Sequence, residues 1–172
     1  MTPRELEEYS ALRATIRERG TTRVWIFVVG LIAWGALAVA TAALASPPVA
    51  TLLPLLILAA SFEAVFALHV GVERAGRYLQ VFYEDQWENV AMAFGRPAGA
   101  IVTDALFSAP FLIAALFNIA PVTVVNPVPV EWIFVGGAHA LFALRVLVAR
   151  FAAAKQRGID LERFRRLKET RP

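Results

Sequence analysis

The sequence predicts an all-α integral membrane protein, built as a four-helix bundle with additional cytoplasmic or interfacial amphipathic helices. The chain has 172 residues and is 58% hydrophobic, whereas soluble domains are roughly 45–50% apolar. Its mean hydropathy is +0.59. The apolar residues are concentrated in four blocks, each long enough for the roughly 20 residues with which a helix crosses a bilayer. A single membrane domain therefore accounts for both the length and the composition.

The charges outside the apolar blocks predict the topology. The four expected spans cover residues 24–45, 50–71, 101–120 and 131–152. The connections after the first and third spans contain no Lys or Arg, whereas the N-terminal segment, the middle segment and the C-terminal tail are rich in arginine. By the positive-inside rule, these three basic segments face the cytoplasm. We therefore expect a multi-pass protein of the inner or plasma membrane with both termini in the cytoplasm.

Residues 1–20 are expected to form a separate cytoplasmic amphipathic helix. Thr2 is placed to cap this helix and to form a capping box with Glu5. Gly20 is expected to end the helix before the first span begins. Such a helix would lie on the membrane surface or on a neighbouring helix.

Residues 158–172 form the basic tail. Gly158 is expected to end the fourth helix, and Asp160 to cap a last short helix. We expect this basic helix to rest on anionic lipid headgroups, at ~1 kcal/mol for each cation near the surface. The basic residues lie beside the membrane, and binding to its headgroups accounts for their positive charge. No nucleic-acid partner is therefore expected.

Residues 72–99 are expected to continue the second span into the cytoplasm as a helical extension. Its aromatic side chains are too many for open water and need lipid, the N-terminal helix or another chain to cover them. Its acidic group, Glu84, Asp85 and Glu88, is expected to be solvated or paired with the basic terminal helices. The sequence leaves open whether the extension lies on the membrane or projects from it.

Five ionisable residues in or beside the spans are the candidate site residues: Glu63, His69, Glu73, His139 and Arg145. Counted at ~1.5 Å per residue, Glu63 lies ~20 Å and Arg145 ~21 Å from the outer side. We expect them to pair, because an unpaired charge inside the bilayer costs roughly 2.5–3.5 kcal/mol. Two alternatives stay open: a protonated Glu63 with Arg145 extended to the headgroups, and Glu63 as a proton-carrying group.

The two histidines do not predict a haem site. His69 and His139 differ by ~16 Å along the membrane normal, so one iron cannot join them within one chain. His69 and Glu73, at i and i+4, are too few ligands for a metal and are expected to form a hydrogen-bonded pair. The chain has no cysteine, which excludes disulfides and thiolate metal sites. No cofactor is expected.

No motif in the sequence identifies an activity. The favoured function is a non-enzymatic membrane scaffold or accessory subunit, acting as a homo-oligomer or within a larger membrane complex. The alternative is a small oligomeric channel or transporter that uses Glu63, Arg145 and His139 as a polar path. A third class is a membrane enzyme that acts on lipid through the face between Glu73 and Glu88.

Overall fold

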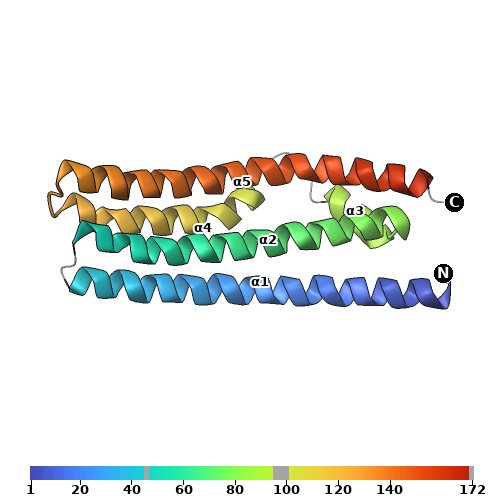
Figure 1. Ribbon diagram of the computed structural model, residues 1–172. Helices are drawn as coiled ribbons and strands as arrows, with labels where there is room; N and C mark the ends of the chain where they lie inside the picture. The colour runs from blue at the N-terminus through green and yellow to red at the C-terminus, as the bar shows by residue number, and fades with distance from the viewer. Residues whose placement is uncertain (45–46, 95–100, 171–172) are drawn as a thin grey trace.

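Three long helices dominate the computed structural model, which describes residues 1–44, 47–94 and 101–170. They are α1 (Pro3–Ala43), α2 (Leu52–Phe82) and α5 (Pro129–Glu169). The three helices run side by side, and both chain termini lie at the same end of the molecule (Figure 1). The described part of the chain contains no strand, which confirms the all-α expectation.

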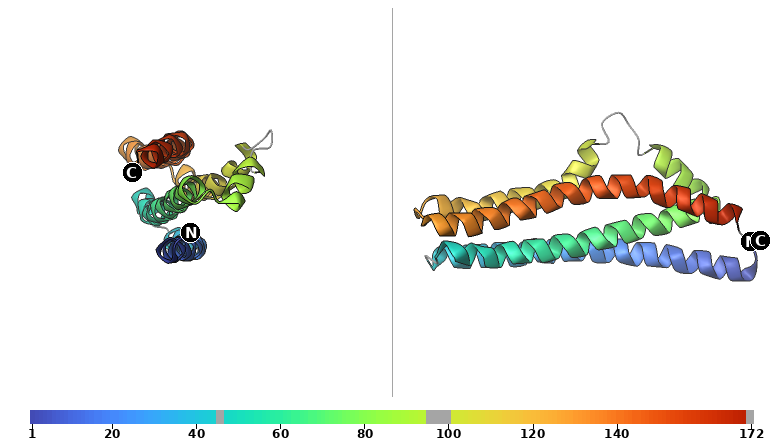
Figure 2. Two further views of the ribbon diagram at one scale, coloured as in Figure 1. Left: turned by 90° about the vertical axis from the view of Figure 1, so that its right-hand side faces the viewer. Right: turned by 45° about the horizontal axis from the view of Figure 1, so that its top comes forward.

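The shorter elements connect the long helices. They are η1 (Pro48–Thr51), α3 (Gln86–Phe94), α4 (Ile101–Ile119) and η2 (Ala120–Thr123). Helix α4 packs against α2 and α5 in the half of the molecule away from the termini. Helix α3 stands off from the long helices at the other end, as two of the views show (Figure 2).

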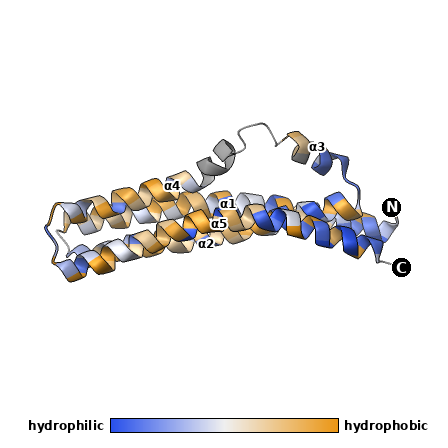
Figure 3. Cartoon of the chain, turned by 90° about the horizontal axis from the view of Figure 1, so that it is seen from above, coloured by the Kyte–Doolittle hydropathy of each residue, from blue (hydrophilic) through white to orange (hydrophobic). Residues whose placement is uncertain are grey.

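Hydropathy divides the molecule into two parts (Figure 3). We call the part that contains α4 the apolar half, and the part that contains both termini the charged end. Three helical segments are long and apolar enough to cross a membrane: Pro3–Ala43, Pro48–Phe82 and Pro129–Glu169. A shorter apolar helix covers Ser108–Thr123. By length and composition, these helices fit a membrane protein.

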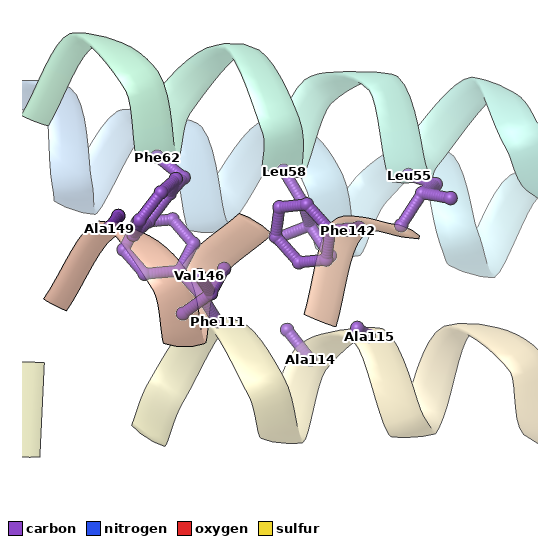
Figure 4. Close-up of a cluster of buried hydrophobic side chains, with 9 residues drawn as sticks. All are labelled: Leu55, Leu58, Phe62, Phe111, Ala114, Ala115, Phe142, Val146 and Ala149. Carbon is purple, nitrogen blue, oxygen red and sulfur yellow. The ribbon is translucent and has the colours of Figure 1, made fainter. Parts of the chain in front are cut away.

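The core of the apolar half is a cluster of nine buried side chains from α2, α4 and α5 (Figure 4). They are Leu55, Leu58, Phe62, Phe111, Ala114, Ala115, Phe142, Val146 and Ala149. Phe62 lies at the centre, where Phe111 and Phe142 meet its ring edge-on at centroid distances of 5.4 and 6.2 Å. Phe27 of α1 meets Phe111 in the same way at 5.7 Å. Aromatic rings therefore fill the space between the helices, a geometry that stabilises beyond the area buried.

Helices α1 and α2 approach closely where Gly30 faces Ser61. A methyl group built on Gly30 would lie 2.6 Å from Ser61 Cβ, closer than two carbon atoms can approach without a shift of the helices. Gly35, on the same helix, has open space around it. The missing side chain therefore matters at Gly30, as expected where small residues let helices pack closely.

Two expected helix ends are wrong. Helix α1 runs unbroken through Gly20, so residues 1–20 and the first span form one helix. Helix α5 likewise continues through Gly158 to Glu169, and Asp160 lies within it and is buried. One glycine inside a helix costs only about 1 kcal/mol relative to alanine, and packing against α2 offsets that cost in both helices.

The capping box and the extension of the second span were predicted more successfully. Glu5 N donates to Thr2 Oγ1 at 3.3 Å, and Thr2 N donates to Glu5 Oε2 at 2.6 Å. Helix α2 continues past the span as far as Phe82. The extension then breaks: Glu84 has a φ of 50°, which reverses the chain, and Lys168 Nζ donates to its carboxylate at 2.7 Å. Residues 95–99 lie outside the described part of the chain.

Candidate functional site

The buried centre of the charged end is an ion pair between α2 and α5. Arg77 and Asp160 expose only 3% and 5% of their surface. Arg77 Nη2 and Arg74 Nε donate to Asp160 Oδ2 at 3.1 and 3.3 Å. Gln156 Nε2 donates to Asp160 Oδ1 at 2.7 Å, so both carboxylate oxygens are engaged. We call these four residues the Asp160 cluster.

Asp160 is held in its ionised form by this cluster. Burial by itself raises the pKa of a carboxyl group, because it disfavours the charged form. The hydrogen bonds from Gln156, Arg77 and Arg74 outweigh burial and hold the pKa of Asp160 below its usual value. The charge fixes the position of α5 against α2, since sliding one helix would leave charged groups buried and unpaired.

Glu73 extends the network towards the apolar half. Its carboxylate lies 3.5 Å from Arg77 Nη1 and 3.1 Å from Arg157 Nε. His69 Nε2 lies 3.5 Å from Glu73 Oε1, so the expected contact of these two residues is present. His69 Nδ1 is 2.9 Å from Arg23 Nη1 on α1. Because arginine only donates, Nδ1 accepts and Nε2 carries the proton towards Glu73.

A small cavity of about 170 Å³ lies beside Arg77, between α1, α2 and α3. Arg77 Nε and Gln80 Oε1 belong to residues on its wall, and neither atom has a hydrogen-bond partner among the described residues. A polar cavity of this size accommodates several ordered waters, each of which needs about 15 Å³ and supplies such missing partners. Glu73 and Glu88 also line it, which disfavours an anion.

Arg13 ties the N-terminal part of α1 to the turn that follows α2. Its Nη2 and Nη1 lie 2.6 Å from Asp85 and 2.9 Å from Glu88. Tyr9 Oη donates to Asp85 at 2.9 Å. Burial opposes the ionisation of Asp85, but the hydrogen bond from Tyr9, the charge of Arg13 and two backbone N–H groups outweigh it and lower the pKa of Asp85. Asp85 and Glu88 are therefore paired with a terminal helix, as the sequence predicts.

Some of the aromatic side chains in the extension of α2 are covered by the terminal helices, α1 and α5. Tyr78 and Phe82 stack at a centroid distance of 4.5 Å, and Phe164 of α5 meets the two rings edge-on at 5.7 and 6.2 Å. Tyr9 of α1 meets Tyr83 at 5.5 Å. These contacts show that the end of α2 projects from the apolar half between α1 and α5. Helix α2 therefore does not bend sideways at the glycines that it contains.

In the apolar half, Glu63 of α2 and Arg145 of α5 form a two-pronged ion pair. Arg145 Nε and Nη2 each lie 2.7 Å from one oxygen of the Glu63 carboxylate. The guanidinium also lies over the rings of Phe66 and Phe62, at 5.4 and 6.0 Å from their centroids. The predicted contact is therefore present. The pair is not buried: the Arg145 and Glu63 side chains are 44% and 48% exposed.

His139 belongs to a different polar group, which lies in the interior of the apolar half. It is 6% exposed, and its Nδ1 lies 2.7 Å from the Val135 carbonyl oxygen. Asn118 Nδ2 lies 3.0 Å from His139 Nε2 and 2.8 Å from the Thr51 carbonyl oxygen. Trp34 Nε1 donates to Asn118 Oδ1 at 3.3 Å. Asn118 thus connects α1, η1, α4 and α5; the sequence predicts a boundary or inter-helix hydrogen-bonding role for Asn118 but not its partners.

An apolar groove of about 430 Å³ lies next to Asn118, between the end of α1, η1 and the end of α4. Trp34 and Phe117 form aromatic walls, while Gly35 and Ala38 leave room on the α1 side. Asn118 is already bonded to three neighbours, so the groove offers a ligand little besides apolar contact.

The five candidate residues therefore fall into three groups. Glu63 and Arg145 pair on the surface of the apolar half, His69 and Glu73 lie beside the Asp160 cluster, and His139 is in the interior. Among the described residues, no three His, Asp or Glu side chains are grouped so that they could hold a metal ion.

Comparison of the chain with protein-family models, with curated proteins and with solved structures found no match. The class of the protein therefore follows from the fold and the polar groups alone. It is an all-α protein with three helices that fit a membrane, two of which, α2 and α5, are joined outside the apolar half by a buried ion pair.

Proposed function

We propose that this protein is a non-enzymatic membrane scaffold, which assembles with a second copy of itself through the α2–α5 face. The observation that carries the proposal is the half-exposed ion pair of Glu63 and Arg145. Charged side chains inside a membrane almost always face other protein or water, because lipid cannot solvate them. An exposed pair at this level therefore needs a protein partner to cover it.

The position of the pair along α2 supports its placement within the bilayer. The residues of α2 before Glu73 contain no charged residue besides Glu63. Glu63 lies six residues before His69, which is about 9 Å at ~1.5 Å per residue. The pair then sits inside the hydrocarbon layer, where each charge left in lipid costs roughly 2.5–3.5 kcal/mol.

A second copy is the partner that the charges favour. The face carries one positive and one negative group side by side, so it is self-complementary under a twofold axis. Two copies related in this way would place each Glu63 close to the Arg145 of the other copy. Ala60 and Ala67 flank Glu63 on the exposed side of α2, and small side chains allow a neighbouring helix to approach closely.

The proposed membrane placement includes four crossings. Helix α5 begins at the end of the molecule remote from the termini, where α1 also ends (Figure 1). The chain must therefore return from the charged end after α2, and α4 makes this return. With the arginine-rich charged end in the cytoplasm, both termini are cytoplasmic. Anionic headgroups would then meet the basic residues nearest the apolar half, such as Lys155.

The channel alternative receives less support from the geometry. His139 faces the interior, whereas Glu63 and Arg145 face outwards. Phe62 and Phe142 fill the centre of the bundle. Within a single chain, Glu63 and Arg145 therefore lie on a different face from His139, the third residue of the predicted polar path.

Disulfide cross-linking in native membranes tests the scaffold proposal. The chain has no cysteine, so single-cysteine variants are unambiguous. We expect Ala60→Cys and Ala67→Cys to give a covalent dimer on mild oxidation. The matched control is Val39→Cys, which is 69% exposed on α1 and should stay monomeric. Adding Glu63→Gln should reduce the cross-linked fraction at position 60 or 67.

Three results would overturn the proposal. One is the absence of dimer at both α2 positions, and another is equal cross-linking at the α1 control. The third is ion flux into vesicles that contain the purified protein, above that of empty vesicles and reduced by Glu63→Gln, which would favour the channel.

A further inference from the structure

Helix α3 carries an apolar face that no other element in the described part of the chain covers. Trp87, Val90 and Phe94 are 67%, 63% and 88% exposed. They are spaced at i, i+3 and i+7 and so lie on one side of the helix. Trp87 and Phe94 are aromatic side chains of the extension that α1 and α5 leave uncovered.

The opposite face of α3 is fixed to the long helices. Glu88 bonds to Arg13 of α1 at 2.9 Å, and Asn89 accepts a hydrogen bond from Gln80 of α2 at 2.9 Å. On a helical wheel with 100° per residue, the centre of this polar face lies roughly opposite the apolar face. The polar contacts therefore set the rotation of α3 and hold its apolar face away from the bundle.

The path of the chain brings α3 back towards the membrane. The reversal at Glu84 directs α3 from the end of α2 towards the apolar half (Figures 1 and 2). Glu88 lies beside Gly76, where an added methyl would be 3.1 Å from its carboxylate. From Gly76 to His69, near the expected membrane boundary, is about 10 Å, and the rest of α3 beyond Glu88 spans about 9 Å.

We propose that the apolar face of α3 docks on the inner-leaflet surface of the lipid bilayer. The inference rests on the membrane placement proposed above but not on dimer formation. Phe94, at the end of α3 nearer the apolar half, enters the boundary between headgroups and acyl chains. Trp87 lies at headgroup level, where tryptophan is enriched. The helix thereby anchors the charged end at a defined tilt, as amphipathic interfacial helices do.

Spin labels on single cysteines in the full-length protein, reconstituted in vesicles of zwitterionic and anionic lipid, test this docking. The readout compares collisions with lipid-soluble oxygen and with a water-soluble nickel relaxant. Val90→Cys and Phe94→Cys should favour oxygen severalfold over Glu84→Cys, which stands in the aqueous turn. Ala93→Cys, exposed on the flank of α3, should be intermediate.

A second measurement leaves the apolar face unmodified. The chain has four tryptophans, and replacing Trp25, Trp34 and Trp132 by Phe leaves Trp87 alone. Brominated lipids should quench its fluorescence. The proposal is overturned if positions 90 and 94 favour the water-soluble relaxant as Glu84 does. It is equally overturned if both relaxants are excluded there, since a protein would then cover the face.

Discussion

Replacing Asp160 by Asn removes the negative charge from the middle of the Asp160 cluster at almost constant shape. Arg77 is 3% exposed and would lose its shortest ionic contact, at 3.1 Å, while Glu73 remains 3.5 Å away. Breaking a buried ion pair costs about 3–5 kcal/mol, and the remaining contact to Glu73 places Asp160→Asn near the lower end. A loss of about 3 kcal/mol corresponds to a roughly 100-fold change in an opening equilibrium.

Hydrogen exchange of the α5 backbone measures this opening in vesicles, because local unfolding exposes backbone amides to exchange. We expect exchange of residues 153–169 to accelerate roughly 100-fold in Asp160→Asn, by the cost above. Glu162→Gln is the matched control on the same helix. Its carboxylate pairs with Arg166 at 3.2 Å but is 68% exposed, and such pairs contribute about 0–1 kcal/mol.

The combination of Arg77→Met with Asp160→Leu separates the contribution of the charges to stability from that of side-chain packing. Replacing both members of a buried ion pair by apolar residues is often neutral or stabilising, so exchange should return to the wild-type rate or fall below it. A change of less than about fivefold in Asp160→Asn, equivalent to ~1 kcal/mol, would refute the view that this ion pair holds α5 to α2.

Three further outcomes follow from the structure. Gly30→Ala should destabilise the α1–α2 contact by about 1–3 kcal/mol in thermal unfolding, since overpacking forces the helices apart, whereas Gly35→Ala, in open space, should be neutral or gain up to about 1 kcal/mol. Because the pKa of Asp85 is lowered in the folded protein, its contribution is complete above the ordinary carboxyl pKa and is lost as pH falls through the folded value. Exchange of α3, corrected for intrinsic rates, should therefore rise as pH falls below the ordinary carboxyl pKa and through the lowered folded value, and Asp85→Asn should weaken that dependence. Burial, with hydrogen bonding to Glu8, raises the pKa of Tyr83 to about 12, so its stabilising contribution is complete below the ordinary phenol pKa and lost through about 12. Phenolate absorbance should show a step there that Tyr83→Phe removes.

The rise per residue was enough to identify which charges could meet in the apolar half. Glu63 and Arg145 are 82 residues apart in the chain, yet helix geometry alone placed them at one level. The same count separated His139 from His69. What the count cannot give is the rotation of each helix about its axis. The outward orientation of the pair therefore emerged only from the structure.

The charged end was predicted less well. The sequence signals for helix ends are local, whereas the contacts that stabilise this part join residues far apart in the chain. Gly20 and Gly158 carry a standard signal for the end of a helix, but α1 and α5 run through them, and both helices pack against α2. Asp160 was interpreted as a cap because it follows a glycine closely. Its charged partners, Arg74 and Arg77, are more than 80 residues away.

The partners of Asn118 were not predicted, for a related reason. A single amide near the end of an apolar span has many uses, and its three bonds come from three other elements. The available signal was its isolation, since α4 has no other amide side chain. That feature marks a candidate for hydrogen bonding between helices without identifying the partners.

The continuity of α1 and α5 has a mechanical consequence. Each helix has 41 residues, a rod of about 60 Å at ~1.5 Å per residue, of which the hydrocarbon layer spans only about 30 Å. In the membrane placement proposed above, and with each helix continuous, a change of tilt by ~10°, within the range known for membrane helices, would swing the far tips by about 5 Å. Such continuous helices would convert a change in membrane thickness or lipid composition into displacement at the chain ends.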